Sequence, residues 1–120
     1  MRILAIAAAL ALAVPACAAA EEAAGAWKVN GHVDGKDFVV TCHFDRKGDS
    51  LGGACFDGGT NLKHPVISGA LSGDDVKWTY VSHWTVVKFD VVYAGKLSGG
   101  AMRGTVGAAG HNGTFTATKQ

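Results

Sequence analysis

Neither sign of charge dominates this sequence. Its 120 residues include 11 Lys and Arg against 10 Asp and Glu. The charges are scattered, so the chain has neither the basic stripe that binds nucleic acid nor an acidic tail for cationic partners. We therefore expect no nucleic-acid partner.

Motifs of catalysis and metal binding are also missing. No serine lies in a nucleophile elbow, no glycine-rich loop leads into a helix, and no pair of carboxylates is arranged for acid–base chemistry. The histidines form no His-x-His or His-x3-His pair, whereas a zinc site needs three or four convergent ligands. These histidines are His32, His43, His64, His83 and His111. The sequence predicts no metal, no cofactor and no catalytic residue.

Residues 1–20 have the pattern of a secretory signal peptide. Arg2 precedes the apolar run Ile3–Val14, Pro15 interrupts it, and small residues precede a cleavage site after Ala20. We expect export to the periplasm or the cell exterior. An alternative stays open, because Val14-Pro15-Ala16-Cys17 resembles a bacterial lipobox. Cys17 would then be lipidated and would anchor the protein to a membrane.

After the leader, residues 21–26 are expected to form an N-terminal arm and residues 27–120 a single domain. Cys42 and Cys55 remain as an even pair, which fits an oxidising compartment. A turn at Gly48-Asp49 would place them opposite each other on neighbouring strands, within reach of a disulfide. Two buried free thiols are the alternative.

Apolar and polar residues alternate with period two along the rest of the chain, and no segment after Ala24 keeps the 3.6-residue period of an amphipathic helix. The alternating runs are Trp27–Val33, Phe38–Phe44, Leu51–Cys55, Val66–Leu71, Val76–Tyr80, Val87–Leu97, Met102–Val106 and Thr114–Thr118. Consecutive short connections favour an up-and-down topology, and closure of the sheet removes its exposed edges. The sequence predicts an all-β, antiparallel, eight-stranded barrel, with an open β-sandwich as the alternative.

Turn residues give the register of two hairpins, with turns at Gly73-Asp74 and Gly99-Gly100. The expected partners are Leu71 with Val76, Gly69 with Trp78, Ile67 with Tyr80, Leu97 with Met102, Gly95 with Gly104, and Tyr93 with Val106. Two opposed glycines on neighbouring strands predict a sharp bend in the sheet. His111-Asn112-Gly113 is expected to be the last turn, because Asn-Gly favours tight hairpins.

Gly25-Ala26-Trp27 begins the first run and Lys119 follows the last. This arrangement resembles the calycin group of barrels, which includes lipocalins and avidins. The resemblance implies that Trp27 closes one end of the barrel and that Lys119 covers its ring by a cation–π contact. The polar residues with which avidins bind biotin have no match in this chain, so that ligand is not expected.

An aromatic cluster departs from the simple alternation. Trp78, Tyr80, His83 and Trp84 lie within seven residues, with His83 and Trp84 expected in the loop beyond the strand. Ligand pockets of barrels lie at the mouth and combine aromatic walls with a few polar groups. We expect this cluster to line a binding site, with Tyr93 and Phe44 as its walls.

Three functions stay open. The first is non-enzymatic binding of a small apolar or aromatic molecule at the barrel mouth. The second is interaction with an envelope protein through an exposed loop or the Glu21–Ala26 arm, since the chain also resembles small exported inhibitors of proteases or lysozyme. The third is a small hydrolase or isomerase-like enzyme with His83 or His64 as its general base.

Overall fold

A computed structural model of the chain describes residues 23–120. The predicted signal peptide and Cys17 lie outside these residues. Strands and tight turns follow one another through the described chain: β1 (Gly25–Val33), β2 (Lys36–Lys47), β3 (Ser50–Asp57), β4 (Lys63–Ser72), β5 (Asp75–Trp84), β6 (Val87–Ser98), β7 (Ala101–Ala108) and β8 (His111–Lys119). No helix within this part of the chain is long and apolar enough to cross a membrane.

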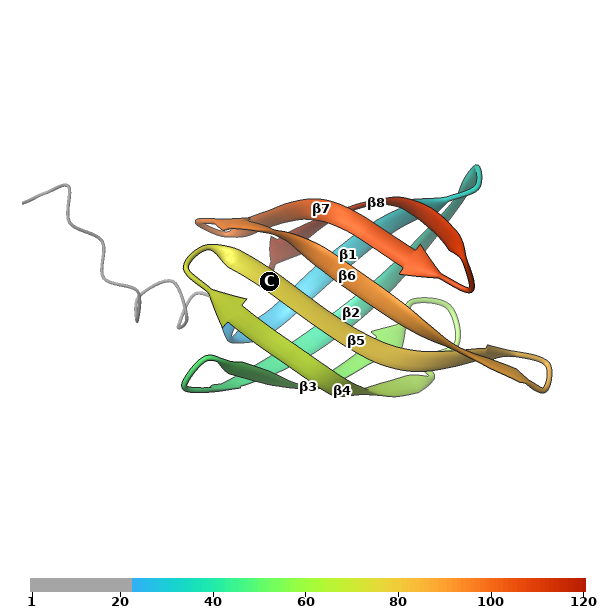
Figure 1. The fold of residues 1–120 in the computed structure, drawn as a ribbon, viewed down its shortest axis with the longest axis horizontal. Helices are drawn as coiled ribbons and strands as arrows, with labels where there is room; N and C mark the ends of the chain where they lie inside the picture. The colour runs from blue at the N-terminus through green and yellow to red at the C-terminus, as the bar shows by residue number, and fades with distance from the viewer. Residues whose placement is uncertain (1–22) are drawn as a thin grey trace, which may run out of the picture.

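The strands form a closed antiparallel barrel in sequence order, and β8 pairs with β1 to complete it. The predicted eight-stranded up-and-down barrel is therefore confirmed. Figure 1 shows that the β2–β3, β4–β5 and β6–β7 turns gather at one end. We call this the closed end, and we call the opposite end, with the β1–β2, β3–β4, β5–β6 and β7–β8 connections, the mouth. The β5–β6 hairpin projects furthest from the mouth (Figure 1).

Most of the predicted register is confirmed. Cys42 lies opposite Cys55 in the β2–β3 pair, and the two are joined as a disulfide. Gly95 lies opposite Gly104. A Cβ atom on Gly104 would lie 2.0 Å from the backbone oxygen of Ala94, so only glycine allows these two strands to approach so closely.

The predicted pairing of Ile67 with Tyr80 is wrong, because β4 contains a β-bulge. Val66 pairs with Tyr80, and the register shifts between Val66 and Ser68, which leaves Ile67 as the extra residue. A single extra residue exchanges the two faces of a strand. Gly69 and Leu71 face the interior on one side of the bulge, and His64 and Val66 face it on the other.

Two other expectations about strand ends are also wrong. The strand that was expected to stop at Tyr80 continues to Trp84, so that His83 and Trp84 belong to β5. The last turn lies at Ala109-Gly110, where both residues have positive φ, rather than at His111-Asn112-Gly113. The turn at Ala109-Gly110 gives β8 nine residues with which to close the barrel against β7 and β1.

The centre of the barrel is filled by aromatic side chains. Trp78 stacks on Tyr93, with ring centroids 4.5 Å apart, and Phe44 and Phe115 pack edge-on against Trp78 at 4.9 and 5.4 Å. Trp78 and Tyr93 have no exposed surface. This layer separates the closed end of the barrel from the mouth.

The closed end is built around Trp27. Its indole Nε1 donates a hydrogen bond to the carbonyl of Ala23 at 2.9 Å, and Lys119 Nζ lies 6.0 Å from the ring centroid. Gly25 lies next to the Lys119 side chain, where a Cβ would be 3.3 Å from Cε. Of the residues of the expected arm, Ala23 is buried, and Gly25 is exposed and begins β1.

Candidate functional site

The mouth of the barrel contains an open cavity of about 970 Å³. This volume is at the upper end of the roughly 300–1,000 Å³ of typical small-molecule sites. Side chains from β1, β2, β5, β6 and β7 form most of its walls. Smaller hollows of about 580 and 610 Å³ lie around Lys96 and around Arg46, but neither is lined by a buried polar side chain of the described residues.

The walls of the cavity are mainly apolar. Phe38, Val40, Phe89 and Val91 contribute aromatic and aliphatic surface from two sides of the barrel. Gly31 on β1 makes room for the Phe38 ring, because a Cβ at Gly31 would lie 2.1 Å from a ring carbon. An aromatic ring over a glycine on the partner strand also restores packing at a weak position of the sheet.

The floor of the cavity contains Tyr80, which is joined to the aromatic layer below it. The hydroxyl groups of Tyr80 and Tyr93 are 2.7 Å apart and form a hydrogen bond. Burial raises the pKa of Tyr80 to about 12, an effect that the hydrogen bond with Tyr93 reduces and the charge of Asp57 increases. Burial also raises the pKa of Tyr93. Both phenols are therefore neutral hydrogen-bonding groups at physiological pH.

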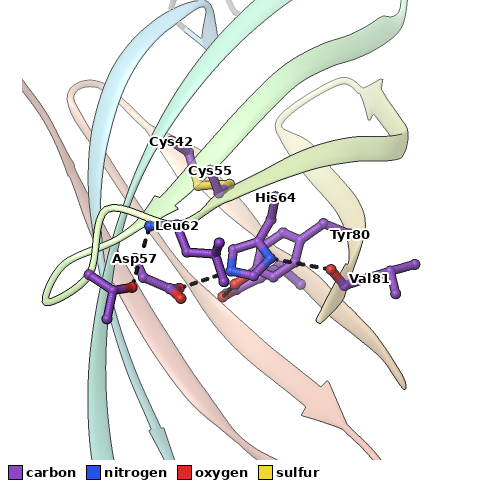
Figure 2. Close-up of polar contacts among 9 residues, drawn as sticks. Cys42, Cys55, Asp57, Leu62, His64, Tyr80 and Val81 are labelled. Atoms are coloured by element: carbon purple, nitrogen blue, oxygen red, sulfur yellow. Dashed lines mark hydrogen bonds and ion pairs between the residues drawn. A yellow bond between two sulfur atoms is a disulfide. The ribbon is translucent and has the colours of Figure 1, made fainter. Parts of the chain in front are cut away.

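A polar pair lies beside Tyr80. Asp57, the last residue of β3, lines the cavity, and its Oδ1 is 3.1 Å from Nε2 of His64 on β4 (Figure 2). The His64 ring stacks on Tyr80 with centroids 4.8 Å apart, and its side chain is only 4% exposed. The bulge at Ile67 makes this arrangement possible, because it turns His64 from the outer face of β4 to the inner one.

Both ring nitrogens of His64 face oxygen acceptors. Nε2 faces the Asp57 carboxyl group, and Nδ1 lies 3.3 Å from the carbonyl oxygen of Val81 (Figure 2). Neither nitrogen therefore has a lone pair free to accept a proton from a substrate. In this geometry His64 holds the Asp57 side chain in place.

The rim of the mouth carries hydrogen-bonded acid–histidine pairs of a different kind. Asp34 contacts His111 between the β1–β2 and β7–β8 turns, and Asp37 contacts His32 at 2.6 Å. All four side chains are more than half exposed. Such exposed pairs contribute little to stability, because water screens them.

The structure divides the predicted ligand-binding residues into three groups. Tyr80 and Trp84 line the mouth cavity, Tyr80 as part of its floor and Trp84 at its rim with 75% of its surface exposed. Trp78, Tyr93 and Phe44 lie below, in the packed aromatic layer. His83 alternates to the outer face of β5 and lies opposite Lys88.

The sequence analysis names His64 only as a candidate general base and does not single out Asp57. The alternation Leu51, Gly53, Cys55 already places Asp57 on the inner face. Simple alternation from Leu71 places His64 on the outer face, because it does not allow for the bulge. No group of three or more His, Cys, Asp or Glu side chains suited to a metal ion occurs among residues 23–120.

Comparison with known proteins finds no matching family, no similar curated protein and no similar solved structure. The function must therefore be argued from the geometry of the mouth.

Proposed function

We propose that this protein is a non-enzymatic barrel that binds a small, largely apolar or aromatic molecule at its mouth. The observation that carries this proposal is the cavity of about 970 Å³, whose walls are mainly apolar and whose floor holds a few fixed polar groups. Ligand sites commonly combine these features, because apolar walls supply affinity and a few polar groups set the orientation of the ligand.

The layered interior supports binding at the mouth rather than deep within the barrel. Trp78 and Tyr93 fill the centre and leave no room for a ligand there. Tyr80, hydrogen-bonded to Tyr93, gives the cavity a rigid floor, and a preformed site loses less entropy when a ligand binds.

We further propose that the barrel is a calycin-like protein that acts after export. The position of Gly25, Trp27 and Lys119 at the closed end supports the first part. The buried Cys42–Cys55 disulfide supports the second, since such bonds persist in oxidising compartments.

Two tryptophan substitutions on adjacent residues of β5 test ligand binding. Ser82 is half-buried and lines the cavity, so Ser82→Trp fills the space that a ligand would take. His83 is exposed on the outer face, so His83→Trp is the matched control. We expect the neutral fluorescent probe N-phenylnaphthylamine to bind the parent protein and the control, and to bind Ser82→Trp about tenfold more weakly or worse. Equal binding by both variants would show that the cavity is not the site.

The tip of the β5–β6 hairpin favours a second candidate function, inhibition of a secreted enzyme such as a protease or lysozyme. Trp84, Val86 and Val87 are 75%, 91% and 62% exposed on the hairpin that projects furthest from the mouth (Figure 1). Thr85 between them has a φ of 55°, which is unfavourable for a β-branched residue and marks a constrained tip. Inhibition of a protease or lysozyme panel by the parent protein but not by Val86→Asp would support this function. A parent protein that inhibits none of these enzymes would exclude them as targets.

A further inference from the structure

We infer that Asp57 is the polar recognition residue of the mouth, and that the ligand carries a hydroxyl or ammonium group that donates a hydrogen bond to it. This inference rests on the proposed binding function and deepens it. It defines the ligand as an amphipathic molecule with an apolar body and a single donor group directed toward the floor of the cavity.

The first argument is the placement of Asp57. Its side chain is 37% exposed, against 56% for Asp34 and 85% for Asp37, the other acidic residues of the cavity lining. Asp57 also lies near Tyr80, because it contacts His64, whose ring stacks on Tyr80. Asp57 is thus the carboxyl group of the lining that a ligand seated on the floor would meet.

The second argument is that Asp57 is held by a buried side chain and still has an acceptor to offer. Oδ1 is taken by His64, which is itself fixed between Val81 and the Tyr80 ring. Oδ2 has no hydrogen-bond partner among residues 23–120. A carboxyl oxygen with two lone pairs and a fixed position is a suitable acceptor for one or two donors of a ligand.

The third argument concerns the cost of a carboxyl group beside apolar walls. A carboxyl group is tolerated at such a place where a hydrogen-bond partner accompanies it. The buried His64 side chain is that partner, with its Nε2 3.1 Å from Oδ1 of Asp57. The cavity can therefore keep a carboxyl acceptor at its floor.

This arrangement predicts how the protein selects among ligands of one shape. A ligand without a donor leaves Oδ2 of Asp57 desolvated and unpaired, and a site built around a hydrogen bond discriminates strongly against such an analogue. Naphthol and naphthylmethylamine present a donor on a naphthalene body, whereas the methyl ether of naphthol presents none. We expect both donor probes to bind the parent protein about tenfold or more tightly than the ether.

Isothermal titration calorimetry of the three probes tests this inference on the full exported chain. Asp57→Ala should abolish the preference for the donor probes, and Asp90→Ala, which removes an exposed carboxylate from the outer face of β6, should retain it. Equal affinity of the parent protein for all three probes would overturn the role of Asp57 and leave the binding function standing. Failure of the parent protein to bind any of them would overturn the binding function itself.

The comparison of probes on the parent protein requires no variant, so it decides the question even where Asp57→Ala folds poorly. A preference that persists unchanged in folded Asp57→Ala would also contradict the inference. A preference for naphthylmethylamine over naphthol would identify an ammonium ligand, and the reverse order would identify a hydroxyl ligand. Both orders support recognition by Asp57.

Discussion

The hydrogen bond between Tyr80 and Tyr93 provides a test of how the cavity floor is joined to the core. The two hydroxyl groups are 2.7 Å apart and both side chains are buried. Tyr80→Phe leaves the Tyr93 hydroxyl without a partner inside the barrel, which should lower the free energy of unfolding by about 1–3 kcal/mol. Tyr93→Phe should cost less, because Tyr80 lines the cavity, where water can replace the lost partner.

The double variant Tyr80→Phe/Tyr93→Phe removes both hydroxyl groups and leaves neither unpaired. Its loss of stability should therefore be smaller than the sum of the two single losses, with a coupling energy of about 1–2 kcal/mol. Urea unfolding at neutral pH, followed by tryptophan fluorescence, gives all four free energies. Single losses that simply add would refute the hydrogen bond as a stabilising contact.

The same pair predicts a loss of stability at alkaline pH. Burial raises the pKa of Tyr80 to about 12, above the ordinary value of 10.0, and raises that of Tyr93 in the same direction. Because the fold favours the neutral phenols, this contribution is complete below about pH 10 and is lost as pH rises through about 12. For Tyr80 alone the two-unit shift corresponds to about 3 kcal/mol. The double Phe variant, which also removes the contribution of Tyr93, should lose at least that much less between pH 10 and pH 12. An identical loss in both proteins would contradict the assignment.

Three further predictions concern the barrel itself. Replacement of Cys42 and Cys55 by alanine should lower the free energy of unfolding by about 3 kcal/mol, since the disulfide closes a loop with a sequence separation of 13. Denaturant titration measures this loss, and an unchanged unfolding midpoint would contradict it. By the same assay, Gly104→Ala should lower the free energy of unfolding by about 2–4 kcal/mol, because its Cβ would meet a backbone oxygen at 2.0 Å. Gly100→Ala is the control, because the nearest atom to its Cβ would be 3.9 Å away. It should change the free energy of unfolding by less than about 0.5 kcal/mol. Trp27→Phe removes the hydrogen bond from the indole to the carbonyl of Ala23, so it should lower the melting temperature. An equal melting temperature would show that this hydrogen bond does not stabilise the closed end.

The barrel was predictable from the sequence because local signals agree with one another. Alternation assigns the inner face, and turn residues assign the register, so the pairs Cys42–Cys55 and Gly95–Gly104 follow without any knowledge of the fold. The Asn112-Gly113 signal failed because both residues lie within β8. Asn112 pairs with Gly107 on β7 and Gly113 pairs with Val33 on β1, and the turn lies at Ala109-Gly110 instead.

The floor of the cavity depends on a feature that alternation cannot reveal. One extra residue in β4, Ile67, exchanges the faces of the strand and brings His64 to Asp57. Nothing in the local sequence marks this bulge, because Val66 and Ile67 are equally suited to the interior. The alternation also does not show how deep in the barrel each aromatic residue of the predicted cluster lies. Tyr80 lines the cavity, whereas Trp78 packs in the aromatic layer below it.

The central claim is that a small apolar ligand binds at the mouth of the barrel, above the aromatic layer. Amide chemical shifts of the isotope-labelled protein, recorded by nuclear magnetic resonance during titration with naphthol, test it residue by residue. The account predicts that the signals of Tyr80, Ser82 and Phe89 move together with one dissociation constant while those of Trp27 and Met102 at the closed end stay in place. Shifts that are largest at the closed end, or a spectrum that naphthol leaves unchanged, would contradict it.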